Sequence, residues 1–189
     1  MKKIRIYLLG FVLALFGLQS CELETELYDA INPDQYPINE RDVRDLVTGN
    51  VYAAFRNRSY DGLFNAATGV NLTSDIATDY GLCSWGGTTW MPIQFANFNA
   101  QEDRNTTKIW TYLNWISKMT LTLDRISDVK FDDQADKDGY IAQIRCGRGF
   151  LAFLVYDMHG PIIVADLETL KDPLAEKILP RLSEEETIN

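Results

Sequence analysis

Two neighbouring stretches carry apolar side chains at intervals of three and four residues, and this pattern limits the possible folds most strongly. In the first stretch the repeating positions are Ile109, Tyr112, Leu113, Ile116, Thr120 and Leu123. In the second stretch, residues 136–159, the face comprises Ile141, Ile144, Arg145, Arg148, Leu151, Ala152, Val155 and Tyr156. Both spacings are those of one face of an α-helix. The sequence therefore predicts an antiparallel helical hairpin of the type stacked in tetratricopeptide repeats, although one hairpin does not establish a repeat.

The second helix is predicted to end at Gly160 and Pro161. Glycine takes the left-handed cap conformation there, and proline cannot continue a helix. Within the helix, Gly147 and Gly149 each cost about 1 kcal/mol relative to alanine. We therefore expect both glycines to mark close contact between helices.

Charged side chains on this helix have structural interpretations. Arg145 and Arg148 share its apolar face, so we expect them to cap or pair with buried acids while their stems pack; anion binding is the alternative. His159, the sole histidine, lies at the helix C-terminus, where the dipole favours a cation.

No GxSxG, P-loop or HExxH motif is present. The sequence therefore predicts no catalytic constellation, no metal site and no cofactor.

The residues before the hairpin divide into one helix and one irregular stretch. Asn39 is a suitable N-cap for an amphipathic helix over residues 40–57. Residues 58–104 are punctuated by glycine and small polar residues, and we expect only a short helix within them, at 63–72. Loops of this length in a compact domain are commonly functional. The predicted fold class is mainly α, with helical hairpins and long irregular loops.

The final residues predict a further helix. Ser183 and Glu186 have the spacing of a capping box, after a polar stretch interrupted by prolines. A single short helix is not stable alone in water. We therefore expect residues 39–189 to be the N-terminal part of a longer helical domain.

The first 20 residues have the organisation of a secretory signal. Lys2, Lys3 and Arg5 precede the apolar run 6–18, which is too short to span a bilayer comfortably. The sequence L-Q-S-C then resembles the lipobox of bacterial lipoproteins, in which the cysteine, here Cys21, is acylated and becomes the new N-terminus. A soluble secreted protein cut elsewhere, or a short membrane anchor, is the alternative.

The chain beyond the signal is strongly acidic. It has 15 basic and 27 acidic side chains, which argues against nucleic acid and against electrostatic binding to anionic lipid. Residues 21–38 form a predicted acidic tether that begins C-E-L-E-T-E. Acidic residues after the cysteine resemble a surface-export signal of Bacteroidota lipoproteins; a solvated tether is the alternative.

The segment 74–92 contains the best candidates for ligand contact. Aromatic planes beside polar acceptors suit ligands that have both an apolar face and hydroxyl groups. Tyr80, Trp85 and Trp90 can supply the planes, and acceptors are available in Asn71, Asp75 and Asp79. The alternative is that one or both tryptophans pin the loop to the helices. A glycosidase needs two carboxylates about 5–10 Å apart across the bond that it cleaves. Many acidic pairs occur in a chain this acidic, so Asp75 and Asp79 are weak evidence for such a site. No EF-hand order of calcium ligands is visible.

Two cysteines remain once Cys21 is lipidated. Export passes through an oxidising compartment, so Cys83 and Cys146 can form a disulfide. Their separation in sequence does not specify a distance in space, and two buried thiols are the alternative.

The chain resembles the SusD/RagB-type nutrient-binding lipoproteins of Bacteroidota outer membranes. The resemblance lies in the lipobox with C-E-L-E-T-E, in I-W-T-Y-L-N-W-I-S-K-M-T-L-T-L-D-R-I, and most specifically in I-R-C-G-R-G-F-L-A-F-L-V-Y-D-M-H-G-P-I-I-V-A-D. Residues at matching positions are Arg145, Arg148, Phe150, Tyr156 and Gly160. Gly149 and His159 depart from the family's usual alanine and aromatic residue. Family members are far longer, so only an N-terminal portion is matched.

The resemblance implies a binding protein and not an enzyme. Such proteins cover a TonB-dependent (SusC-like) outer-membrane channel and capture oligosaccharides, or sometimes peptides, for nutrient uptake in polysaccharide utilisation. We therefore expect a lipid-anchored protein on the cell surface that binds glycan. The alternatives are a surface-anchored glycoside hydrolase, a structural or adhesive surface lipoprotein, and a truncated remnant without function.

Overall fold

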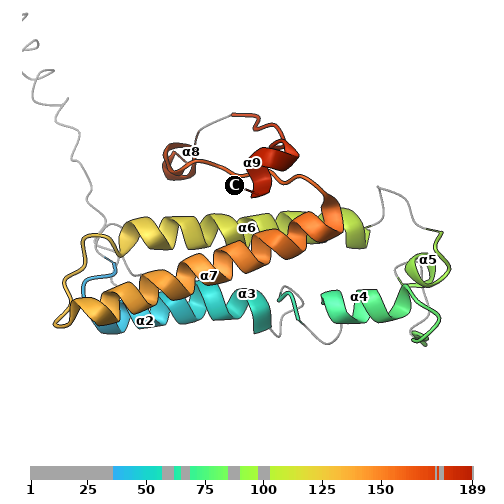
Figure 1. The fold of residues 1–189 in the computed structure, drawn as a ribbon, viewed down its shortest axis with the longest axis horizontal. Coiled ribbons are helices and arrows are strands. Elements are labelled where there is room, and N and C mark those ends of the chain that lie inside the picture. The colour runs from blue at the N-terminus through green and yellow to red at the C-terminus, as the bar shows by residue number, and fades with distance from the viewer. Residues whose placement is uncertain are drawn as a thin grey trace, which may run out of the picture. The chain divides into compact units, whose positions relative to one another are not determined.

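A computed structural model of the chain describes residues 36–56, 62–64, 69–84, 90–97, 103–172, 174 and 177–188, without the side chains of 103–108. The description below concerns the unit of residues 35–189, which is separate from residues 1–34. The predicted signal peptide, Cys21 and most of the tether lie outside the described residues. The unit of residues 35–189 is mainly helical, and its described residues contain no β-strand (Figure 1). The predicted mainly-α class is thus confirmed, whereas its tetratricopeptide character stays a prediction.

The first helical stretch is continuous but contains a π-helical turn. It comprises α2 (Glu40–Val47), the π-turn η2 (Thr48–Tyr52) and α3 (Ala53–Arg56), as the sequence predicted. The side chain of Asn39 accepts a hydrogen bond from the backbone N–H of Asp42 at 3.0 Å, which confirms the predicted N-cap. The buried face of this stretch consists of Val43, Leu46, Val47, Val51 and Ala54.

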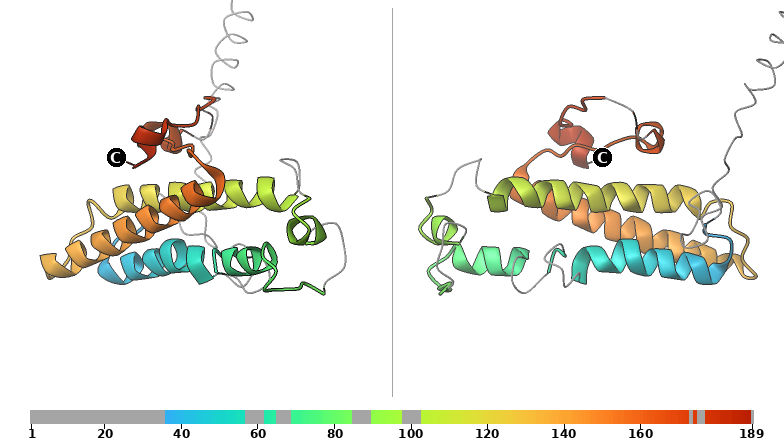
Figure 2. Two further views of the ribbon diagram at one scale, coloured as in Figure 1. Left: turned by 45° about the vertical axis from the view of Figure 1, so that its right-hand side comes forward. Right: turned by 180° about the vertical axis from the view of Figure 1, so that it is seen from behind.

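The two long helices form the predicted hairpin. Helices α6 (Asp103–Arg125) and α7 (Gln134–His159) run antiparallel and pack against each other, while α2 and η2 lie beside α7 (Figures 1 and 2). The turn between them is fastened by Lys137, whose ammonium donates hydrogen bonds to the carbonyl oxygens of Ser127 and Val129. A lysine in the first turn of α7 therefore holds the turn that follows α6 in place.

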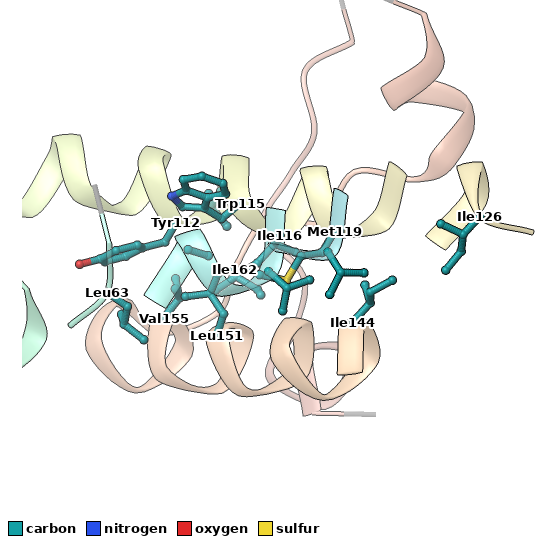
Figure 3. Packing of buried hydrophobic residues seen from close by; sticks show 14 of the residues in the cluster. Leu63, Tyr112, Trp115, Ile116, Met119, Ile126, Ile144, Leu151, Val155 and Ile162 are labelled. Atoms are coloured by element: carbon teal, nitrogen blue, oxygen red, sulfur yellow. The ribbon is translucent and has the colours of Figure 1, made fainter. Parts of the chain in front are cut away.

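The core fills the space between these helices. Leu151 and Val155 of α7 face Ile116 and Met119 of α6, and Ile144 lies further along the same interface (Figure 3). All five side chains are buried. The residues that cover the core from elsewhere are Val43, Val47, Val51, Ala54, Leu63 and Ile162. Among the polar bonds beside this packing, the amide of Asn50 in η2 donates to the hydroxyl of the buried Thr122 in α6.

The two glycines of α7 have different surroundings. A Cβ on Gly147 would lie 2.7 Å from Cγ1 of Val51, so the predicted close contact is present, with η2. A Cβ on Gly149 would meet nothing within 4 Å, and the residue is exposed. The prediction of close helix contact is therefore confirmed for Gly147 and, as far as the described residues are concerned, wrong for Gly149.

The arginines of α7 also differ from expectation. Arg145 is exposed, and Arg148 is half-buried and donates a hydrogen bond to the hydroxyl of Thr120 at 3.2 Å. No acidic side chain in the described part of the chain forms an ion pair with either arginine, so the predicted pairing with buried acids is wrong there. Nη1 of Arg148 instead bonds to a neutral hydroxyl on α6, and the rest of the half-exposed guanidinium remains within reach of solvent.

The end of α7 is capped from two directions. Gly160 has φ +72° and donates its N–H to the carbonyl of Tyr156, so the predicted positive-φ cap is present. Nη1 of Arg181 donates hydrogen bonds to the carbonyl oxygens of His159 and Pro161, at 3.0 and 3.1 Å. A residue far along the chain thus satisfies carbonyl groups at the end of the helix.

This environment predicts a pH dependence. Burial, and secondarily the charge of Arg181, lower the pKa of His159 below its usual 6.5. The folded state then binds this proton less readily than the unfolded state, so the free energy of unfolding falls as the pH drops below about 6.5. Urea denaturation at several pH values should show a smaller decrease for His159→Gln than for the natural chain. Equal decreases would contradict this role of His159.

The remaining helices are short. They are α4 (Val70–Ile76), α5 (Met91–Gln94), α8 (Leu167–Lys171) and α9 (Glu184–Ile188). The helix predicted at 63–72 begins later, since residues 63 and 64 form a turn and α4 starts at 70. No helix in the described part of the chain is long and apolar enough to cross a bilayer.

The C-terminal stretch contains the predicted capping box. The backbone N–H of Ser183 donates to the carboxylate of Glu186 at 2.8 Å, and the N–H of Glu186 donates to the hydroxyl of Ser183 at 3.2 Å. The bond from the backbone N–H of Ser183, and a second from its hydroxyl to the same carboxylate at 2.7 Å, lower the pKa of Glu186. An ion pair of 2.7 Å between Lys171 and Asp124 links α8 to α6.

Candidate functional site

The segment with the predicted binding residues has a small core of its own. Ile76 of α4, Ile93 of α5 and Trp90 are 1%, 5% and 6% exposed, and together they form a second hydrophobic cluster. Leu72 and Cys83 pack against it. Pro92 stands at the start of α5, where its missing N–H has no cost. The stretch is therefore organised by local packing despite its loop-like composition.

Trp90 supplies the centre of this cluster. Its side chain lies at the start of α5 against the two isoleucines, so its ring is not a plane open to solvent. The ring is therefore part of the local packing of α4 and α5, and its role in ligand contact stays a prediction. Trp85, the other predicted plane, lies outside the described residues.

Tyr80 is the predicted plane that the structure exposes, at 95%. It follows α4 in a hydrogen-bonded turn, in which the hydroxyl of Thr78 donates to the carbonyl of Asp75 at 2.8 Å. The backbone N–H of Tyr80 donates to the same hydroxyl at 3.2 Å. Gly81 passes close by, since a Cβ there would lie 3.0 Å from the carbonyl oxygen of Asp75. The backbone under the ring is thus fixed while the ring projects into solvent.

The predicted acceptors lie on α4 and in the turn that follows it. Asn71, Asp75 and Asp79 are all exposed. Helix α4 ends at Ile76, so the two carboxylates do not share a helix face as residues four apart on one helix would. Exposed carboxylates are suitable acceptors for hydroxyl groups. Within the described ranges, no group of three or more His, Cys, Asp or Glu side chains is arranged to hold a metal ion.

Exposed apolar residues around α5 extend this surface and were not predicted. Phe95 is 65% exposed and Leu82 is 81% exposed. Ala96 has φ +51°, a left-handed conformation that is rare for alanine, and the following Asn97 is exposed. The bond from the N–H of Asn97 to the carbonyl of Pro92, at 2.7 Å, holds this bend. The sequence signal for this exposed surface was an aromatic residue followed by a small and a polar residue, directly after a helix that begins with proline.

The cysteines follow neither of the two alternatives completely. Cys83 is half-buried in the second cluster, and Cys146 is exposed on α7. Both are free thiols. The disulfide that the sequence left open is therefore absent, and the alternative of two buried thiols is not met either, since Cys83 is only partly buried and Cys146 is exposed.

Comparison of the chain with known protein families, with curated proteins and with solved structures finds no match. A functional assignment therefore depends on the chemistry of the residues described above and on the sequence motifs.

Proposed function

We propose that this chain is a SusD/RagB-type lipoprotein that captures glycans on the cell surface for import through a TonB-dependent outer-membrane channel. The observation that carries the proposal is the ring of Tyr80, 95% exposed at a hydrogen-bonded turn that follows α4, in a segment whose polar side chains Asn71, Asp75 and Asp79 are also exposed. The lipobox and the motif around α7 support the same assignment.

An exposed aromatic ring in the same segment as exposed polar side chains suits a sugar, because a sugar ring has two kinds of surface. The C–H face of a pyranose packs on an aromatic ring, and its hydroxyl groups donate to carboxylate and amide oxygens. Leaving an aromatic side chain in water forgoes about 1.5–3 kcal/mol of burial, which a ligand can recover when it covers the ring. Phe95 and Asn97 offer a second pair of the same kind beyond Trp90.

The proposed mechanism is capture without covalent chemistry. The small core of Ile76, Trp90 and Ile93 keeps the binding turn ordered, which lowers the entropy lost on binding. Acyl chains on Cys21 would hold the protein in the outer membrane, and the acidic tether would separate it from the lipid surface. The channel would then receive the ligand from this surface.

Affinity electrophoresis of the full chain through gels that contain single polysaccharides tests the capture proposal. We expect retardation in at least one gel, with the polysaccharide recovered at its original chain length. Shortened products would instead assign a glycoside hydrolase. An unretarded chain that still promotes cell–cell contact would indicate an adhesive lipoprotein, and an unretarded chain without contact activity would indicate a remnant.

Anchoring has a separate expected result. Protease added to intact cells should remove the natural chain from the cell surface, and Cys21→Ser should release the chain from the membrane fraction, since the acylated thiol is lost. The matched control is Cys146→Ser, which removes an exposed thiol from α7 and should leave the protein anchored. Membrane retention of Cys21→Ser would contradict lipidation at that residue.

A further inference from the structure

The exposed face of α7 has a regular pattern that the packing of this chain does not use. Positions separated alternately by four and three residues follow this face, which is the spacing of a coiled-coil seam. We name the set the α7 seam: Ala135, Gly139, Ala142, Cys146, Gly149 and Phe153. Gly139 is partly exposed and the other five residues are exposed.

The glycines of the seam are not explained by any contact with the described residues. A Cβ on Gly139 or on Gly149 would meet nothing within 4 Å, in contrast to Gly147, whose Cβ would strike Val51. Each glycine inside a helix costs about 1 kcal/mol relative to alanine. Small side chains on a helix face permit the close approach of another helix, and here that helix must come from outside the described contacts.

Large apolar side chains extend the same face. Phe150 is 46% exposed and Phe153 is 62% exposed. Phe150 stacks on Phe55 with ring centroids 5.9 Å apart, and Phe64, 42% exposed, completes the aromatic group. Exposed aromatic groups next to a small-residue seam are typical of an interface.

The charges beside the seam indicate what covers it. Asp138 and Arg145 flank the seam on one side, seven residues apart, and both are exposed. Asp138 accepts a hydrogen bond from Gln134, and Arg145 has no ion pair with any described residue. When two copies of α7 pack antiparallel, this flank meets its own equivalent. Asp138 of each copy then faces Arg145 of the other, which gives two symmetry-related ion pairs.

We propose that the α7 seam is the contact surface for a second copy of this chain, with the two α7 helices antiparallel. In the register set by Asp138 and Arg145, Gly139 lies opposite Ala142 of the second copy, and Ala135 lies opposite Cys146. The closest layers of the interface therefore consist of small residues. Phe150 and Phe153 extend beyond them, onto the turn that precedes α7 in the second copy.

Charge reversal tests this register. Sedimentation equilibrium of the full chain, in density-matched detergent and under reducing conditions, should show a monomer–dimer equilibrium. Asp138→Arg and Arg145→Asp should each weaken dimerisation about tenfold or more, because each creates two like-charge contacts. An equimolar mixture of the two variants should recover dimers, since every pair across that heterodimer joins an arginine to an aspartate.

Two further variants separate the interface from general effects of charge and folding. Glu168→Arg changes net charge as much as Asp138→Arg does, at an exposed site on α8, and should leave dimerisation unchanged. Gly139→Leu adds bulk where the chain itself has open space, so it should keep the circular dichroism of a folded helical protein and abolish dimers. A monomeric natural chain up to about 1 mM, or dimers that resist both charge reversals, would overturn the proposal.

Discussion

Gly147→Leu is expected to lower the free energy of unfolding by about 3 kcal/mol or more, because the site cannot accept a side chain without moving a neighbouring helix. A Cβ there would lie 2.7 Å from Cγ1 of Val51 and 3.5 Å from Cε2 of Phe55. Both neighbours belong to the stretch α2–η2–α3, so the strain falls on the contact that seats this stretch against α7. Urea denaturation followed by circular dichroism measures the change.

The matched control stands two residues away on the same helix. Gly149→Ala adds a methyl group in open space, so it should raise the free energy of unfolding by about 1 kcal/mol through helix propensity. Measurements at low protein concentration exclude any contribution from self-association. The changes in the free energy of unfolding should therefore have opposite signs for the two substitutions. Similar destabilisation by both would contradict the packing of α7 against η2.

Leu151→Ala should destabilise the fold by about 2–5 kcal/mol, since it leaves a cavity at the centre of the core. Leu151 is fully buried and faces α6 between the side chains of Ile116 and Met119 (Figure 3). The loss combines the transfer free energy of the removed methyl groups with contacts that the surrounding helices cannot restore. Thermal and chemical denaturation both measure it.

Phe153→Ala removes a larger side chain from the neighbouring face of the same helix. Because Phe153 is 62% exposed, we expect a change below about 1 kcal/mol at low protein concentration. A larger loss for Phe153→Ala than for Leu151→Ala would show that α7 is rotated about its axis relative to the structure described here.

The sequence was most informative where structure is determined locally. The N-cap at Asn39, the capping box of Ser183 and Glu186, and the end of α7 at Gly160 depend on residues within one helical turn, and all three were predicted correctly. The long amphipathic helices were also identifiable, because a repeating apolar face has no other regular interpretation.

Predictions failed where neighbouring positions on a helix differ in their surroundings. Arg145 and Gly149 lie close in sequence to the buried face of α7 but are exposed, since each residue turns the helix by about 100°. Periodicity identifies a buried stripe, yet it does not define which edge positions the partner helices cover. The π-turn at η2 likewise has no signal in the apolar spacing.

The candidate site shows the same limit for aromatic residues. Trp90 and Tyr80 occupy one segment rich in glycine and small polar residues, and their sequence contexts did not distinguish them. The difference arises from Ile76 and Ile93, which lie within reach of Trp90 only after α4 and α5 have formed. Burial of this kind depends on contacts between helices that local sequence does not encode.

The most direct test of the glycan-capture account is the dissociation constant of the full chain for a retarding polysaccharide, measured by affinity electrophoresis for two tyrosine variants. Tyr80→Ala should weaken binding about tenfold without loss of stability, because it removes the exposed ring. Tyr52→Ala, which removes a 53% exposed tyrosine from η2, should bind as the natural chain does. Unchanged binding by Tyr80→Ala, or equal loss in both variants, would contradict a binding surface on the segment of α4 and α5.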